Sequence, residues 1–486
     1  MASLGWCKTA CAVYLITIST SIAAPAQTFR VLANFGPTDG VDPNTLIQGA
    51  DGNFYGTTLD GGANLFGGTV FKITPDGAVT ILHNFCSQPG CPDGAGSDGA
   101  LVQGTDGDFY GTTESGGNSS GGGTVFKITS EGTLITLYSF CNFFGCANGD
   151  GPLAPLIQAI DGNFYGSTIV GGTYGGGIIF RITSSGVLTT VYNFCPEMGC
   201  KDGYAPEAAL VEGLDGNFYG TTANGGDESC NPPYGCGTVF KLTPGGTLTG
   251  LHTFESSDGM FPSALVQPKN GNLYGTTPAC GLNNHGTIFE ISPAGNLKTI
   301  YNFCIQTNCA DGAAPISGLV EATDGNLYGT TVIGGNPACR DGQGCGTLFR
   351  MTPSGPFATV FDFSLATGSG PAGLLQATDG RFYGALGPSS RTRCWLCSTI
   401  YSLDIGLGPF VRLERYSGGV GQNSGILGQG FTGTTGVWLN GTPANFTVKS
   451  DTYIRATVPA GATSGYVTVQ TPTGMLTSNR PFRVMP

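Results

Sequence analysis

Hydrophobic and polar residues alternate in short runs along this chain, and the runs return in a fixed order. One cycle contains residues 101–103, 109–112, 124–128 and 134–140, all rich in β-branched or aromatic side chains. Such runs, separated by Gly-, Asp- and Pro-containing turns, predict β-strands, and none has the period of a helix. Each cycle therefore predicts four short strands, named A, B, C and D in chain order.

The cycle is a tandem repeat. A Tyr-Gly pair after an Asp-Gly or Asn-Gly turn marks strand B and recurs seven times, at intervals of 54 or 55 residues. The tyrosines are Tyr55, Tyr110, Tyr165, Tyr219, Tyr274, Tyr328 and Tyr383. Seven four-stranded units of this length predict a seven-bladed β-propeller. Residues 28–35 match strand D, and the seventh repeat supplies only A to C. We therefore predict that this N-terminal strand closes the ring.

The two ends of such units differ. The A–B and C–D turns lie at one end, which we call the turn face, and they are short and uniform. The B–C and D–A loops lie at the other end, the loop-rich face, and they are long, variable and rich in cysteine. Variable loops on rigid strands are the usual place for recognition. We expect any ligand site on the loop-rich face, near the central channel.

The repeated phrases also resemble a known family. Residues 51–58 read Asp-Gly-Asn-Phe-Tyr-Gly-Thr-Thr, and residues 68–77 read Gly-Thr-Val-Phe-Lys-Ile-Thr-Pro-Asp-Gly. This pattern resembles the GloVer (Gloeobacter/Verrucomicrobia) tandem repeat over about residues 28–405. The resemblance implies an exported or cell-surface bacterial protein, and it supplies no functional residues.

The C-terminal segment differs from the repeats. It contains no cysteine, and its alternating strands are separated by Gly, Asn and Pro turns. The landmarks at residues 428–431, 440–441 and 458–461 resemble those of an IPT/TIG domain, an immunoglobulin-like β-sandwich. The predicted organisation is a signal peptide at 1–26, a propeller at 27–406 and an IPT/TIG-like domain, acting as spacer or adhesion module, at 407–486.

Composition and the N-terminus narrow the class. Of 486 residues, 83 are Gly and only 11% are charged, which excludes a coiled coil or long-helix bundle. The net charge of −12 argues against a nucleic-acid ligand. Lys8, an apolar run and Ala24-Pro25-Ala26 are typical of a signal peptide. The alternative, a membrane anchor, is disfavoured because the run is short and contains Ser and Thr. We expect an extracellular, cell-surface or periplasmic protein.

Cysteine spacing agrees with export. Beyond residue 26 the cysteines fall into close pairs, with Cys280 left over: Cys86/Cys91, Cys141/Cys146, Cys195/Cys200, Cys230/Cys236, Cys304/Cys309, Cys339/Cys345 and Cys394/Cys397. Such pairs in an exported chain predict disulfides. The alternative, zinc ligation, needs cysteines that converge on one point, and these pairs recur far apart.

Two further sets of residues are candidates for chemistry. Asp-Gly pairs recur in the D–A loops, at Asp39, Asp93, Asp150, Asp202, Asp258 and Asp311. Their carboxylates could bind Ca²⁺, although Asp-Gly is also ordinary turn chemistry. Among three histidines only His285, in a B–C loop, is placed for general-base work, since His83 and His252 fall in D strands.

Loop aromatics, together with His285, are the remaining candidates for ligand contact: Phe143, Phe144, Tyr174, Tyr204, Tyr234, Phe261, His285 and Trp395. Their rings suit stacking on carbohydrate or peptide, or packing between loops.

We predict a non-enzymatic, monomeric binding or adhesion protein for a glycan or protein ligand, with no nucleic acid, no membrane segment after signal cleavage and no cofactor beyond possible calcium. The alternatives are a propeller enzyme of lyase or hydrolase type and a structural surface component.

Overall fold

The computed structural model describes residues 27–141, 144–339, 342–353, 355–387 and 398–485. The chain is all-β, with many small antiparallel sheets, and no α-helix occurs among the described residues. The predicted signal peptide, Phe143, Cys394, Trp395 and Cys397 lie outside the described residues. No helix in the described part is long and apolar enough to cross a membrane.

The repeat region forms seven sheets in which consecutive strands pair in order. The second repeat consists of β7 (Val102–Gln103), β8 (Phe109–Thr113), β9 (Thr124–Ile128) and β10 (Leu134–Ser139). All four predicted strands are therefore correct to within one residue.

The other repeats follow the same plan. The first sheet contains β2 (Val41–Pro43), β3 (Ile47–Gln48), β4 (Phe54–Asp60), β5 (Thr69–Ile73) and β6 (Val79–Asn84). The third and fourth contain β11 (Ile157–Gln158), β12 (Phe164–Thr168), β13 (Ile178–Ile182), β14 (Leu188–Asn193), β15 (Val211–Glu212), β16 (Phe218–Thr222), β17 (Thr238–Leu242) and β18 (Leu248–Thr253). The fifth and sixth contain β19 (Leu273–Thr277), β20 (Thr287–Ile291), β21 (Leu297–Asn302), β22 (Val320–Glu321), β23 (Leu327–Thr331), β24 (Thr347–Met351) and β25 (Phe357–Asp362). Two single-turn 3-10 helices, η1 (Phe144–Cys146) and η2 (Thr307–Cys309), lie in D–A loops.

The N-terminal strand completes the last sheet. The seventh repeat supplies β26 (Ser369–Gln376), β27 (Phe382–Gly387) and β28 (Ser398–Asp404), and β1 (Thr28–Phe35) pairs antiparallel with β28. Thr28 lies opposite Asp404, and Phe35 lies opposite Ser398. The strand-D role predicted for residues 28–35 from the phase of the repeats is therefore present.

Aromatic side chains pack between neighbouring sheets. The ring of Tyr110 in the second sheet lies 4.0 Å from that of Phe164 in the third, centroid to centroid. The same contact joins the seventh sheet to the first, where the rings of Tyr383 and Phe54 are 4.2 Å apart. The two middle strands of a sheet, such as β8 and β9, are thus almost wholly buried on both faces, in agreement with the low charge content of the chain.

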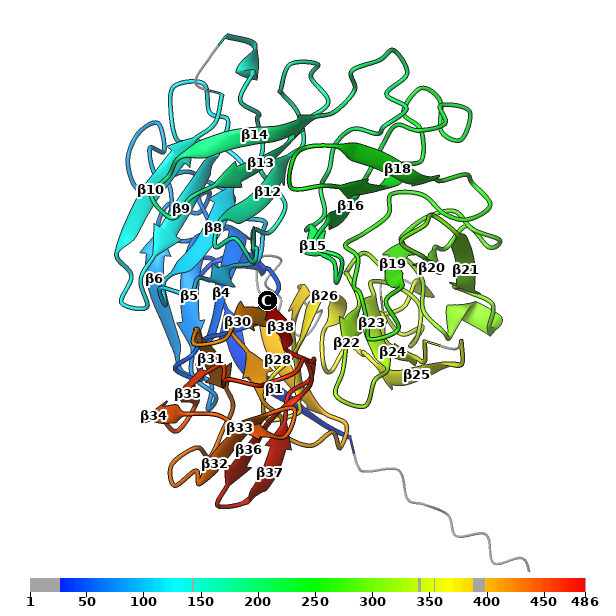
Figure 1. The fold of residues 1–486 in the computed structure, drawn as a ribbon. Helices are drawn as coiled ribbons and strands as arrows, with labels where there is room; N and C mark the ends of the chain where they lie inside the picture. Colours follow the sequence, from blue (N-terminus) through cyan, green and yellow to red (C-terminus); the bar gives the residue numbers. More distant parts are fainter. Residues whose placement is uncertain (1–26, 142–143, 340–341, 354, 388–397, 486) are drawn as a thin grey trace, which may run out of the picture.

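An inner ring of hydrogen bonds links the A strands. One Gln or Glu from each repeat takes part: Gln48, Gln103, Gln158, Glu212, Gln267, Glu321 and Gln376. The backbone N–H of Ala50, for example, donates to Oε1 of Gln103 in the next repeat at 2.9 Å. The N–H of Thr378 in the seventh repeat donates to Oε1 of Gln48 in the first at 3.0 Å. Figure 1 shows A strands such as β15, β22 and β26 nearest the centre and D strands at the outside.

The A–B turn explains the repeated Asp-Gly-Asn-Phe-Tyr phrase. Tyr55 is fully buried, and its hydroxyl donates to Oδ2 of Asp51 at 2.8 Å. Lys72 of strand C lies 2.9 Å from the same carboxylate. The Asp51 carboxylate also accepts from Asn53, an Asx turn that fixes the bend. The phrase therefore joins turn geometry to a buried tyrosine and a cation.

The C-terminal region has its own core. One sheet contains β29 (Arg412–Leu413), β31 (Asn423–Leu427), β35 (Tyr453–Thr457) and β34 (Phe446–Ser450). A second contains β33 (Thr442–Pro443), β32 (Gly436–Leu439), β36 (Val467–Thr471) and β37 (Gly474–Thr477), and β30 (Ser417–Gly419) pairs with β38 (Arg483–Met485). One hydrophobic cluster takes residues from both sheets, including Ile426, Ile454, Val437 and Val469.

This region lies against the turn face. Thr452 donates to the carbonyl oxygen of Ala50 at 2.9 Å, and the N–H of Phe410 donates to that of Thr378 at 3.0 Å. Both acceptors belong to A–B turns. Figure 1 shows β30, β38 and the C-terminus near the centre of the repeat sheets. The turn face is therefore partly covered, whereas the loop-rich face lies at the opposite end of the strands.

Candidate functional site

Disulfides brace the loop-rich face. Six of the seven predicted pairs are bonded: Cys86–Cys91, Cys141–Cys146, Cys195–Cys200, Cys230–Cys236, Cys304–Cys309 and Cys339–Cys345. Four of them close D–A loops, and the other two lie within B–C loops. Cys280 is a free, half-buried thiol whose pKa is raised by burial. The disulfides indicate an oxidising, exported location.

The D–A aspartates tie their loops to strand D. Asp93 accepts from the backbone N–H of Cys86 at 3.1 Å and is hydrogen-bonded to His83 Nε2 at 2.8 Å. The hydroxyls of Tyr192 and Tyr301 donate in the same way to Asp202 and Asp311, and His252 Nε2 lies 2.7 Å from Asp258. Asp39 accepts from Gly36 N–H at 3.0 Å. Each of these carboxylates takes part in loop structure.

The D–A loop between the second and third repeats departs from this pattern. Asn148, not Asp150, bonds to the strand-D tyrosine, with its Nδ2 2.9 Å from the Tyr138 hydroxyl oxygen. Asp150 lies two residues further on, where its backbone pairs with Val170. Its carboxylate comes near the sulfurs of the Cys141–Cys146 disulfide. In this loop Asn148 therefore takes the structural place that an Asp holds in most other loops, and calcium binding by Asp150 stays a prediction.

The described residues form two groups that could hold a metal by proximity. One contains His285, Cys304 and Cys309, and the other contains Cys141, Cys146 and Asp150. Both include a disulfide, whose sulfurs carry no thiolate to bind a metal. The six D–A aspartates are not brought together, and calcium binding stays a prediction. The same geometry places the His285 ring beside a disulfide, with no carboxylate in its group, so its role as a base also stays a prediction.

The loop aromatics are placed differently from one another. Tyr174 is 53% exposed, Tyr234 is 56% exposed and Phe261 is 36% exposed. Tyr204 is half-buried, and burial, then the neighbouring Tyr234 and Glu228, raises the pKa of its hydroxyl. The Tyr204 backbone pairs with Asn224, and Gly225 N–H donates to the Tyr234 carbonyl oxygen. Tyr204 and Tyr234 therefore lie on adjoining loops.

Further apolar residues on this face are exposed and were not predicted. Of the nineteen large hydrophobic residues exposed in the described chain, eleven lie on B–C or D–A loops. Eight of these were not predicted: Leu65, Phe66, Val170, Met198, Leu282, Ile305, Ile316 and Leu365. The signal was an apolar residue within a Gly-rich loop, where it has no strand to pack against. Gathered exposed apolar side chains are typical of an interaction surface.

Three acids lie where the chain enters strand A on the same face, and we call them the acidic mouth: Asp42, Asp98 and Glu207. Desolvation and then the negative charges of Glu114 and Asp42 raise the pKa of Asp98. Desolvation and then Asp98 raise that of Glu207. Asp98 and Glu207 come from different repeats, so they converge through the fold alone. Perturbed acids that converge are candidates for binding or proton transfer.

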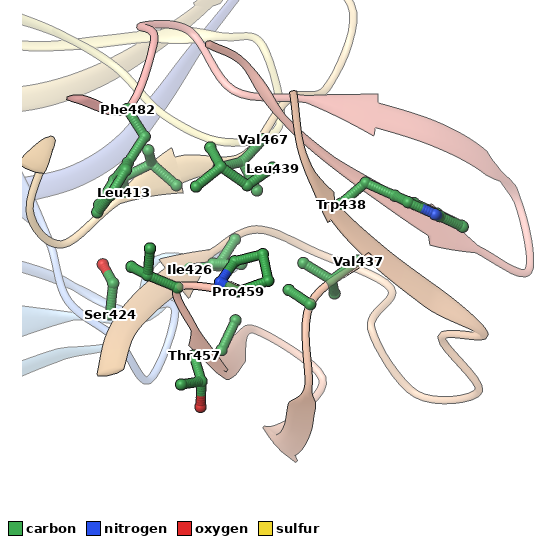
Figure 2. Close-up of a pocket in the computed structure, with 13 residues that line it drawn as sticks. Leu413, Ser424, Ile426, Val437, Trp438, Leu439, Thr457, Pro459, Val467 and Phe482 are labelled. Atoms are coloured by element: carbon green, nitrogen blue, oxygen red, sulfur yellow. The ribbon is translucent and has the colours of Figure 1, made fainter. Parts of the chain in front are cut away.

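A separate small cavity lies inside the C-terminal region. Figure 2 shows Leu413, Ile426, Val437 and Val467 around it, drawn from both sheets. Its volume is about 30 Å³, and its wall is almost wholly apolar. That is close to the volume of one water in the liquid, ~30 Å³. It is a packing gap in the core and offers no room for a ligand.

These features define an all-β tandem-repeat protein with disulfide-braced loops. The chain belongs to the Gloeobacter/Verrucomicrobia repeat family, whose model matches residues 8–232 and 228–446. The predicted family is therefore correct for the repeats. No curated protein matches the sequence.

Solved structures resemble the fold at low identity. A fungal alcohol oxidase of the AA5 family, in complex with copper, is 12% identical with a TM-score of 0.52, covering 94% of this chain and 99% of its own. A gluconolactonase-like protein is 11% identical (TM-score 0.38, covering 79% and 94%). A 6-phosphogluconolactonase-like protein from Bacteroides uniformis is 17% identical (TM-score 0.41, covering 66% and 84%).

The oxidase corrects one prediction. We predicted a non-enzymatic protein, and this prediction is wrong, because the fold matched over nearly the whole of both chains is that of an enzyme. The likeness concerns the fold alone and transfers neither the reaction nor the copper.

Proposed function

We propose that residues 27–406 form a closed seven-bladed β-propeller, exported after removal of residues 1–26, and that residues 407–486 form an IPT/TIG-like immunoglobulin-type domain. The inner ring supports closure, because its bonds run from each repeat to the next and from Thr378 back to Gln48. The pairing of β1 with β28 and the Tyr383–Phe54 contact support it at the same junction.

The loop-rich face is the binding face in this proposal, and its ligand is a glycan or a protein at the cell surface. The observation that carries it is the uneven distribution of exposed apolar side chains, which gather on these loops. Aromatic rings such as Tyr174 and Tyr234 suit stacking on sugar rings. The disulfides hold the loops in place before the ligand arrives, which reduces the entropy cost of binding.

A catalytic role at the acidic mouth is the second candidate. The observation that favours it is the pair of raised carboxyl pKa values at Asp98 and Glu207. An acid whose pKa is raised keeps its proton closer to neutral pH and can donate it to a leaving group, while an ionised partner acts as base. Lyase or hydrolase chemistry on a glycan uses such a pair.

A binding screen tests the first role. The mature protein is applied to a glycan array and to cell-surface extracts, with calcium present and with calcium chelated. We expect selective binding that falls when Tyr174 and Tyr234 are replaced by Ala. Val187, exposed at a C–D turn on the other face, is the matched control, and Val187→Ala keeps full binding. No binding under either calcium condition contradicts the proposal.

A turnover assay separates the second role from the first. Glycans that bind are incubated with the protein, and products are followed as new reducing ends or as unsaturated sugars by ultraviolet absorbance. Catalysis predicts turnover that is lost in Asp98→Asn and Glu207→Gln while binding persists. Binding without products would contradict the catalytic role of the acidic mouth.

A further inference from the structure

A cavity lies between the turn face and the C-terminal region, at the end of the strands opposite the loop-rich face. Its volume is about 220 Å³. Glu321 of β22 and Gln376 of β26 line one side, and Arg412, Tyr416 and Arg480 of the C-terminal region line the other. It exceeds the ~30 Å³ share of a single water several times over. It is therefore large enough for a small organic molecule.

The cavity carries an excess of positive charge. Arg412 and Arg480 bring two guanidinium groups, and Glu321 brings one carboxylate. The Glu321 carboxylate lies 3.8 Å from Nε of Arg480 and is almost fully buried. Arg412 donates to the carbonyl oxygen of Gln48 at 2.5 Å. No carboxylate of the described residues lies within 4.0 Å of the Arg412 guanidinium.

Arg412 is a half-buried cation without an acidic partner among the described residues. Burial lowers the pKa of Arg412, the direction expected when a charge loses its hydration. Buried charges in proteins are normally paired, because desolvation without a partner is costly. The Gln48 carbonyl oxygen accepts one hydrogen bond, whereas a guanidinium group carries five N–H donors. An anion inside the cavity would supply the missing counter-charge.

We propose that this cavity binds a small hydroxycarboxylate of monosaccharide size, a hexuronate or similar sugar acid, with its carboxylate on Arg412 and Arg480. The planar guanidinium fork matches a carboxylate with two parallel hydrogen bonds. Glu321 accepts hydrogen bonds from sugar hydroxyls, and Tyr416, whose hydroxyl lies 3.2 Å from Oδ1 of Asn479, presents a polar edge. Apolar side chains such as Leu374 provide the surface under the sugar ring.

The site has a consequence for the C-terminal region. Its ligand would touch the repeats through Glu321 and the C-terminal region through both arginines, so binding would hold the two together. The cavity and the loop-rich face lie at opposite ends of the strands, and the inference does not rest on the proposed function of that face.

Calorimetry on the full mature protein tests the proposal with D-galacturonate, D-galactose and inorganic phosphate as probes. We expect one galacturonate site and no galactose binding. Arg412→Met and Arg480→Gln should each raise the dissociation constant by about tenfold or more, the effect of losing a hydrogen bond to a charged group. Arg483→Gln is the control and should leave binding unchanged. Arg483 donates to the Leu214 carbonyl oxygen at the same interface without lining the cavity.

Three results would overturn the proposal. Galacturonate could fail to bind the wild-type protein, or phosphate could bind equally well, which would mark an adventitious ion only. Arg483→Gln could weaken binding as much as Arg412→Met, which would assign the effect to the interface. If Arg412→Met does not fold, Arg480→Gln and the wild-type probe series still decide, because the Arg480 side chain is 38% exposed.

Discussion

The turn face and the acidic mouth of the loop-rich face lie at opposite ends of the same strands. Their carboxylates differ in the groups that surround them. On the turn face, the Asp51 carboxylate serves Tyr55 and Lys72 together, and the pattern recurs at Asp106 and Tyr110. On the loop-rich face, Asp98 lies among other acids that raise its pKa. The Asp51 carboxylate is paired within its own repeat, whereas the acids of the acidic mouth lie near one another and raise each other's pKa.

The difference separates scaffold from function. Paired groups such as Asp51, Tyr55 and Lys72 stabilise the repeats, since their hydrogen bonds are already made. Exposed apolar residues and neighbouring acids on the loop-rich face lower the free energy of unfolding. Such destabilising features are typical of sites that bind a ligand. Mutations on the two faces should therefore differ in size and in sign.

The largest effect should come from a buried tyrosine of the repeat phrase. Tyr110 is fully buried, packs on Phe164 and bonds to Asp106. Tyr110→Ala should lower the free energy of unfolding by about 3–5 kcal/mol, the usual cost of removing a buried aromatic ring. Urea denaturation followed by circular dichroism measures it. Tyr174→Ala on the loop-rich face is the control and should leave the midpoint unchanged; equal losses would erase the contrast between the faces.

Next in size is the loss of one loop disulfide. Replacing Cys195 and Cys200 by Ser together should cost about 2 kcal/mol, because closing a loop of about five residues removes that much chain entropy from the unfolded state. The thermal midpoint with and without reductant measures it. Cys280→Ser, which removes a free thiol, should change little and is the matched control. A reductant-insensitive wild type would contradict the bracing role.

A smaller effect tests the exception on the turn face. In the fifth repeat Asn270 stands for the turn Asp and Glu290 for the strand-C cation, and the Tyr274 hydroxyl donates to Glu290 at 2.9 Å. Asn270→Asp should place two carboxylates beside one hydroxyl and cost about 1 kcal/mol. Adding Glu290→Lys should restore the common pattern and recover that loss. Additive effects in the double-mutant cycle would contradict the pairing.

Repetition decided what could be predicted from the sequence. Strands B to D were found because seven copies of one phrase show which positions alternate. The inner ring was missed because a lone Gln such as Gln103 in a two-residue strand is typical of an exposed edge, and its partner Ala50 lies 53 residues away. Asn148 was missed because the residue before Gly149 is Asn, whereas most other loops have an Asp-Gly pair at this place. The docking of Arg412 and Thr452 occurs once, so no repeat could disclose it.

The smallest effect is the change in the free energy of unfolding when Asp98 and Glu207 are replaced. Its sign should be opposite to that for Asp51 on the turn face. Folding raises the pKa of Asp98 and Glu207, so the native state holds protons more tightly than the unfolded state and loses stability as pH rises through their titration. Asp98→Asn with Glu207→Gln should therefore stabilise the protein at pH 7, by at most about 1 kcal/mol because both side chains face solvent. The gain should vanish below pH ~4, where the wild-type carboxyls are protonated.

Asp51 supplies the opposite case. Burial opposes its ionisation, but hydrogen bonds from Lys72, Asn53 and Tyr55 prevail and lower its pKa. Its contribution is present above the ordinary pKa of ~4 and is lost as pH falls through the lowered value. Asp51→Asn should therefore destabilise at pH 7, with a deficit that shrinks in acid. Urea midpoints at neutral and acid pH for both variants measure the two slopes. If the stability difference between variant and wild type changed with pH in the same direction for both variants, the carboxylates of the acidic mouth would be paired like Asp51. The contrast between the two faces would then be contradicted.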